Sequence, residues 1–242
     1  MKKIVCLLLA AAALAACHPR ESGDLARLKK LAAKEYAPKP QKHTQGNITS
    51  YDMTNPDRQQ AMYLALNSSA PDITPYLREN ANRLDPEYLF WLLARLSKEK
   101  APLQEVLYWS YLAPLRAEQD AVLCQDETAR QAPAALTYDF LLPALLPYRD
   151  ELNALPPHER QGMIHQLTEK VDIWDRHNPP QNSPLWICYQ GIEAFLNKPQ
   201  LIEESRQPAA RKAARDAYWK RINTTRQTEP DKRPLPYAGS RP

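Results

Sequence analysis

The apolar and polar positions along most of the chain follow the pattern of short amphipathic helices. From Asn55 onward, apolar residues recur at intervals of three and four, as they do on one face of an α-helix. Asn55-Pro56-Asp57 and Asp85-Pro86-Glu87 are typical helix starts, because a capping residue precedes a proline in the first turn. Alternating runs of strand length are nearly absent. We therefore predict an all-α fold, a single helical domain of packed helix hairpins.

Prolines between the apolar runs divide this region into many short elements, in keeping with 23 Pro and only 5 Gly. Helices are expected from the two starts above and from Pro102, and also over the ranges 71–84, 126–131, 134–146, 157–174, 184–196 and 207–222. The scarcity of glycine argues against phosphate-cradling loops, and no Walker motif, G-x-G-x-x-G or G-x-S-x-G is present. We therefore expect no cofactor and no nucleotide.

The first sixteen residues have the features of a cleavable signal. Lys2 and Lys3 precede an apolar run over 4–13, which is too short for a bilayer-spanning helix. The next residues, Leu14-Ala15-Ala16-Cys17, resemble the lipobox of bacterial lipoproteins. The resemblance implies cleavage before Cys17, diacylglycerol on its thiol, and an acyl chain such as palmitate on its new amine. A Sec signal with an accidental cysteine is the alternative.

The residue after Cys17 bears on which membrane holds the lipid. It is His18 and not the aspartate that marks inner-membrane retention in enterobacterial lipoproteins. The analogy favours the outer membrane, with the protein facing the periplasm; display on the cell surface is the alternative.

The remaining sequence divides into a tether, a body and a tail. Residues 17–50 are expected to form a lipidated tether, with an amphipathic stretch at 24–36 and a polar, proline-containing linker at 37–48. Residues 51–225 form the helical domain, and 226–242 lack periodicity and are expected to be disordered.

Two cysteines remain after signal cleavage and lipidation. Because the envelope is oxidising, Cys124 and Cys188 are expected to form a disulfide that closes a loop of about 65 residues. Two buried free thiols are the alternative. The pair would bring residues 186–189 against Gln125 and Asp126, where a groove is possible. Asp126 and Thr128 are interpreted as caps of the helix that follows.

One polar cluster near the end of the 157–174 helix is a candidate for chemistry. Asp172, Asp175 and His177 lie close together in the sequence, and His165 precedes them. Such groups could converge on an ion or a substrate, although the H-E-x-x-H spacing of zinc proteases is absent and we expect no metal. The alternative is a helix end capped by Asp175 and His177.

One helix pair has a family resemblance. Residues 87–113 have Trp109 and Ala113 where a helix crossing places an aromatic and a small residue, which resembles a tetratricopeptide or Sel1-like hairpin. Residues 99–102 replace the glycine of the family's turn, and no second copy follows at a fixed period.

The mature chain is expected to carry little net charge. Net charge falls from +4 to +2 once Lys2 and Lys3 leave with the signal, which disfavours nucleic-acid binding. The sequence favours a non-enzymatic envelope lipoprotein with a membrane anchor and a protein partner. One version is an immunity lipoprotein against a delivered toxin. The alternatives are an envelope hydrolase acting on cell wall or lipid, and a spacer between membrane and wall.

Overall fold

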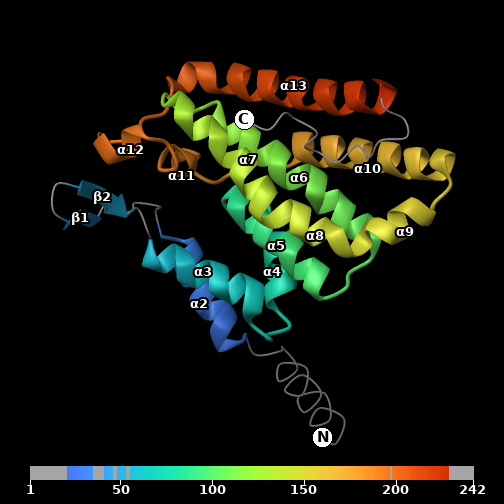
Figure 1. Ribbon diagram of the computed structural model, residues 1–242, viewed down its shortest axis with the longest axis horizontal. Helices are drawn as coiled ribbons and strands as arrows, with labels where there is room; N and C mark the ends of the chain where they lie inside the picture. Colours follow the sequence, from blue (N-terminus) through green and yellow to red (C-terminus); the bar gives the residue numbers. More distant parts are fainter. Residues whose placement is uncertain (1–20, 35–40, 46–47, 53–54, 197, 229–242) are drawn as a thin grey trace, which may run out of the picture.

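The computed structural model describes residues 21–34, 41–45, 48–52, 55–196 and 198–228. Within these ranges the protein has an all-α fold, as predicted, with one short strand hairpin beside it (Figure 1). Helices α5 (Pro86–Lys98) and α6 (Leu103–Ala121) pack against each other as a central hairpin. In the described part of the chain, no helix has the length and apolarity needed to span a bilayer.

Helix α5 lies at the centre of the core because most of its residues are apolar and are covered by neighbouring elements. Its residues from Pro86 to Leu93 are all buried, and α6 is buried over most of its length. Trp109 and Ala113, expected at a helix crossing, are 7% and 0% exposed. The 87–113 segment therefore forms the middle of the molecule.

The turn between α5 and α6 contains a residue in the left-handed conformation. Lys100 has a φ of 54°, and no other non-glycine residue with positive φ occurs in the described residues. The backbone N–H of Ala101 donates to the carbonyl of Leu96 at 3.0 Å, which is the six-residue bond of a Schellman motif. Lys100 thus occupies the position that glycine usually fills.

Helix α2 (Gly23–Ala32) belongs to the packed body, which corrects the expected tether over 17–50. Leu25, Leu28 and Leu31 of α2 are buried in the main core, and α2 packs on α3 (Pro56–Asn67) and α4 (Ile73–Glu79). Ser22 caps α2, and both its amide and its hydroxyl donate to the Asp72 carboxylate. A helix with a buried leucine stripe cannot serve as a free spacer.

A second difference from the expected tether lies in the polar linker. Strands β1 (Gln41–Gln45) and β2 (Ile48–Asp52) pair antiparallel, with Gln41 opposite Asp52 and Gln45 opposite Ile48. The hairpin overlaps the stretch interpreted as a linker.

The segment from 127 to 154 forms an irregular rod, although the sequence predicted one helix over 134–146. It contains η1 (Glu127–Gln131), α7 (Ala132–Leu136), the π-helical turn η2 (Thr137–Leu141), α8 (Leu142–Leu145), η3 (Leu146–Tyr148) and α9 (Arg149–Ala154). Pro143 and Pro147 have no N–H to donate, so regular α-helical bonding is interrupted.

The C-terminal part of the chain packs across α6. Helices α10 (Pro157–His177) and α13 (Gln207–Thr228) both contact α6, and the short helices α11 (Leu185–Cys188), α12 (Glu193–Leu196) and η4 (Glu204–Arg206) lie between them in sequence (Figure 1). Helix α13 continues three residues into the expected tail. The expected signal, Cys17 and residues 229–242 lie outside the described residues.

Candidate functional site

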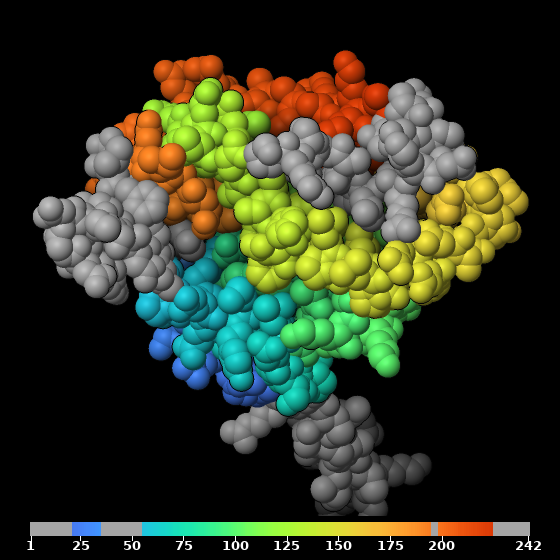
Figure 2. All heavy atoms as spheres, viewed as in Figure 1, coloured from blue at the N-terminus to red at the C-terminus, as the bar shows by residue number. Residues whose placement is uncertain are grey.

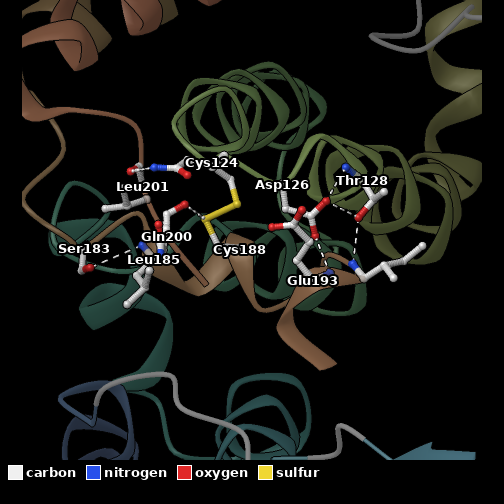
Figure 3. The surroundings of a disulfide bond; sticks show 11 residues. Cys124, Asp126, Thr128, Ser183, Leu185, Cys188, Glu193, Gln200 and Leu201 are labelled. Carbon is white, nitrogen blue, oxygen red and sulfur yellow. Dashed lines mark hydrogen bonds between the residues drawn. A yellow bond between two sulfur atoms is a disulfide. The ribbon is translucent and has the colours of Figure 1, made fainter. Parts of the chain in front are cut away.

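A disulfide joins Cys124, just after α6, to Cys188 at the end of α11 (Figure 3). The Cα atoms are 5.4 Å apart, and both cysteines are 0% exposed. The expected bridge is therefore confirmed, and both thiols are committed to it.

Backbone hydrogen bonds extend this junction. The Gln125 amide donates to the Gln200 carbonyl at 3.0 Å, and the Ile202 amide donates to the Leu123 carbonyl at 2.8 Å. The chain on either side of α12 is thus fastened to the residues that follow α6, by the disulfide at Cys188 and by strand-like pairing of Leu201 with Cys124. This arrangement holds segment 185–202 in place.

Asp126 acts as a cap, as the sequence predicted, and joins two elements (Figure 3). One carboxylate oxygen accepts from the Thr128 amide at 2.9 Å, and the other accepts from the Glu193 amide at 2.8 Å. Burial of the carboxylate opposes ionisation, but bonds from the Thr128 hydroxyl and from the Glu193 and Thr128 amides outweigh it and lower the pKa of Asp126. A Cβ at Gly191 would overlap this carboxylate, so the approach requires glycine.

The structure does not bring the four polar candidates of α10 together. Asp175 is 1% exposed, whereas His165 and His177 lie on the surface. Asp172 pairs with Arg176, and the His177 ring bonds the Ile173 carbonyl within its own helix. No group of three or more His, Cys, Asp or Glu side chains in the described ranges could hold a metal ion. The hydrolase hypothesis loses the residues on which it depended.

Asp175 instead belongs to a buried ion-pair network. Its two carboxylate oxygens lie 2.7 Å from Nε of Arg116 and 2.7 Å from Nε of Arg215. The Gln119 side-chain amide donates to the same carboxylate at 3.0 Å. Three helices, α6, α10 and α13, thus meet on one aspartate whose charge is compensated.

Asp120 is the second buried carboxylate of this region. It accepts from the Trp186 indole at 2.8 Å and the Asn182 amide at 3.1 Å, and it pairs with Arg211 at 2.8 Å. This role of Asp120 was not predicted from the sequence, although Asp120 follows the long apolar run of α6. Because fixed donors hold both aspartates, the network joins helices and offers no free base for catalysis.

Beside this junction, Trp186 borders two mixed polar and apolar pockets. One pocket, of about 250 Å³, lies where Asp85, Asn182 and Ser183 meet the end of α2. The other, of about 280 Å³, lies against α7 and the π-helical turn. Neither pocket is lined by Cys124, Gln125 or Asp126, where the sequence suggested a groove; both lie beside Trp186.

A third pocket is almost entirely apolar. It measures about 190 Å³ and lies between the start of α6 and the segment α8–η3–α9, which occupies the surface in Figure 2. The Tyr148 hydroxyl donates to the Ala101 carbonyl at 2.7 Å and fixes η3 against the α5–α6 turn. Leucines make up most of its wall, which consists of Leu103, Leu107, Leu142, Leu145, Leu146, Tyr148, Arg149 and Leu152.

This apolar pocket is the candidate functional site. Leu146 on its wall is 65% exposed, and Tyr138, in the π-helical turn two elements earlier, is 74% exposed. Large apolar side chains that stay in water beside an open apolar pocket are a feature of interaction surfaces. The apolar residues of this pocket are visible in the sequence, but the sequence does not show which of them remain exposed to solvent.

Comparisons with known proteins leave the family open. No family model matches the chain, and no curated protein or solved structure matches it either.

Proposed function

We propose that this chain is an envelope lipoprotein whose helical body binds a protein partner through the apolar pocket between α6 and α9. The observation that carries the proposal is that pocket, with Leu146 exposed on its wall. At about 190 Å³ it is smaller than the roughly 300–1,000 Å³ typical of small-molecule sites. It suits one apolar anchor side chain of a partner, as in the centre of a protein interface.

The lipid would hold this body close to the membrane. Helix α2 is capped by Ser22, only five residues after Cys17, and it is packed into the core. Five residues reach at most about 18 Å when fully extended. The partner would therefore be met near the bilayer surface, in the periplasm if the outer-membrane expectation is right.

An immunity role against a toxin delivered to the periplasm is one form of this function. An immunity protein must bind the toxin soon after the toxin enters the periplasm. A permanent lipid anchor would favour such binding because it keeps the immunity protein at the membrane. Deletion of the gene should then sensitise cells to the effector, and unchanged resistance would remove this version while leaving the binding role intact.

The binding role is tested by capture from crosslinked envelopes with matched variants. Leu146→Glu places a charge on the pocket wall, and Ile173→Glu makes the same change at another exposed aliphatic residue, on α10. Proteins captured with the wild type and with Ile173→Glu, but lost with Leu146→Glu, support the proposal. Equal recovery by all three proteins would contradict it.

A further inference from the structure

We propose that the partner segment is a basic amphipathic helix, whose apolar anchor enters the apolar pocket and whose lysine or arginine meets Asp139. This inference rests on the proposed function and specifies the chemistry of the partner. It depends on a second pocket, on the charge of that pocket, and on the spacing of the two.

The second pocket is lined by the same segment of chain as the first. Residues of η1, α7 and the π-helical turn form one wall of this 280 Å³ space, namely Gln131, Ala132, Ala135, Leu136 and Asp139. The opposite wall carries Glu87, Trp186 and Gln190. The lining is mixed, with amide and carboxylate groups beside apolar ones, so it suits a side chain with a polar end.

The uncompensated charge of this second pocket is negative. Glu87 is 5% exposed and its carboxylate is paired with Arg58. Asp139 is exposed and forms no ion pair with any other residue that the structure describes. An incoming lysine or arginine would supply the missing cation and could donate to the side-chain oxygens around it.

Arg149 lines the apolar pocket and pairs with Asp150. Glu105 pairs with Arg78, which leaves Glu151 as the carboxylate beside the pocket that has no ion pair among the described residues. Asp150 and Glu151 follow Arg149 on α9 and are exposed. Burial raises the pKa of Tyr148, and the nearby carboxylates of Glu151 and Glu105 add to the rise. A partner with basic residues around its apolar anchor is therefore favoured over an acidic one.

Asp139 and Leu146, one residue from each pocket, have a spacing that suits a bound helix. They are seven residues apart on a rod of π-helical, α-helical and 3-10 turns, which is on the order of 10 Å if the mean rise is near that of an α-helix. On a bound helix, two side chains seven residues apart lie on one face at the same separation. The anchor and the basic residue of the partner should therefore be two turns apart.

Designed peptides test this arrangement by fluorescence anisotropy. The target is the full chain carrying Cys17→Ser, so that no lipid is attached. Three labelled alanine-based helices each carry one leucine. The first has arginine seven residues away, the second has glutamine there, and the third has arginine five residues away, on another face.

The first peptide is expected to bind about threefold more tightly than either other peptide, the scale of a partly exposed ion pair. Asp139→Asn should abolish the preference for arginine. Asp216→Asn, which removes a charge from the exposed side of α13, should preserve it. Equal binding of the arginine and glutamine peptides, or a preference that survives Asp139→Asn, would overturn the inference.

Failure of the underlying function would look different. If no peptide binds, or if Leu146→Glu binds as well as the wild type, the apolar pocket is not a docking site and both proposals fail. Binding that appears only in a chain ending at Thr228 would identify the chain's own C-terminal residues as the occupant, and would also overturn the inference. Leucine-dependent binding without a preference for arginine would refute the basic partner alone.

Discussion

Lys100 holds the left-handed position of the α5–α6 turn at a cost that glycine would avoid. A non-glycine residue in this conformation loses roughly 1 kcal/mol, whereas glycine adopts it freely. We predict that Lys100→Gly raises the free energy of unfolding by about 0.5–1 kcal/mol in urea denaturation. Lys100→Ala, which removes the charge and keeps the Cβ, serves as the control and should change little. A Lys100→Gly protein no more stable than Lys100→Ala would contradict this account.

Asp175 is the aspartate on which three helices depend. Replacing it with asparagine would leave Arg116, whose side chain is 3% exposed, without its compensating charge. We expect Asp175→Asn to lower the free energy of unfolding by about 3 kcal/mol.

The neighbouring pair on the surface provides the comparison. Asp172→Asn breaks an ion pair with Arg176, whose side chain is 61% exposed, and should cost less than about 1 kcal/mol. If Asp175→Asn and Asp172→Asn lower the free energy of unfolding by similar amounts, the buried network contributes no more to stability than a surface ion pair.

Asp126 should make stability depend on pH. Its pKa is lower in the folded protein than in the unfolded chain, so the ionised carboxylate stabilises the fold above the ordinary pKa of about 3.9. That contribution is lost as pH falls through the folded-state pKa. The stability gap between the wild type and Asp126→Asn should therefore narrow below about pH 4 in urea titrations. A gap that stays constant from pH 6 to pH 2 would exclude this linkage.

Residue roles were predictable from sequence where the signal was local. The caps at Asn55 and Asp126 were expected from their positions, and their side chains do accept bonds from the following amides. The pairing of Asp120 with Arg211, ninety-one positions later, has no local signal. His165 and Asp175 share a helix, yet His165 is exposed and Asp175 is buried. The difference depends on how α6 and α13 pack against that helix, which the sequence does not show.

At the scale of elements, the disulfide holds segment 185–202 to the end of α6. The chain-entropy estimate for closing a loop of this size is about 4 kcal/mol. We predict that Cys124→Ala/Cys188→Ala loses roughly 2–4 kcal/mol of stability. Hydrogen exchange should accelerate most in 185–202 and least in α5, which is buried on every face. Uniform acceleration would show that the bridge does not act locally.

Elements were predicted well where apolar periodicity was strong and poorly where prolines or turns controlled the backbone. Helices α3, α5, α6 and α10 begin close to their expected starts. The expected helix over 134–146 is broken near Pro143 and Pro147. The strand hairpin was missed, although Gly46-Asn47 separates Gln45 from Ile48 and is a known hairpin signal.

At the scale of the whole molecule, α2 changes the expected relation between the body and the lipid proposed for Cys17. Its buried leucines place the start of the folded body a few residues after Cys17, where the sequence had indicated a long tether. The all-α class and the disulfide followed from composition and pattern. The apolar pocket did not, because it depends on how a proline-broken segment meets the start of α6.

The central claim is that a protein partner occupies the apolar pocket, and site-specific photocrosslinking in intact envelopes tests it most directly. A benzophenone amino acid is placed at position 146, and the control is placed at position 173, where an aliphatic side chain is 50% exposed. The account predicts one discrete adduct from position 146, lost when Leu107 on the pocket wall is changed to Ala, and none from position 173. The same adducts from both positions, or an adduct at 146 that is indifferent to Leu107→Ala, would contradict it.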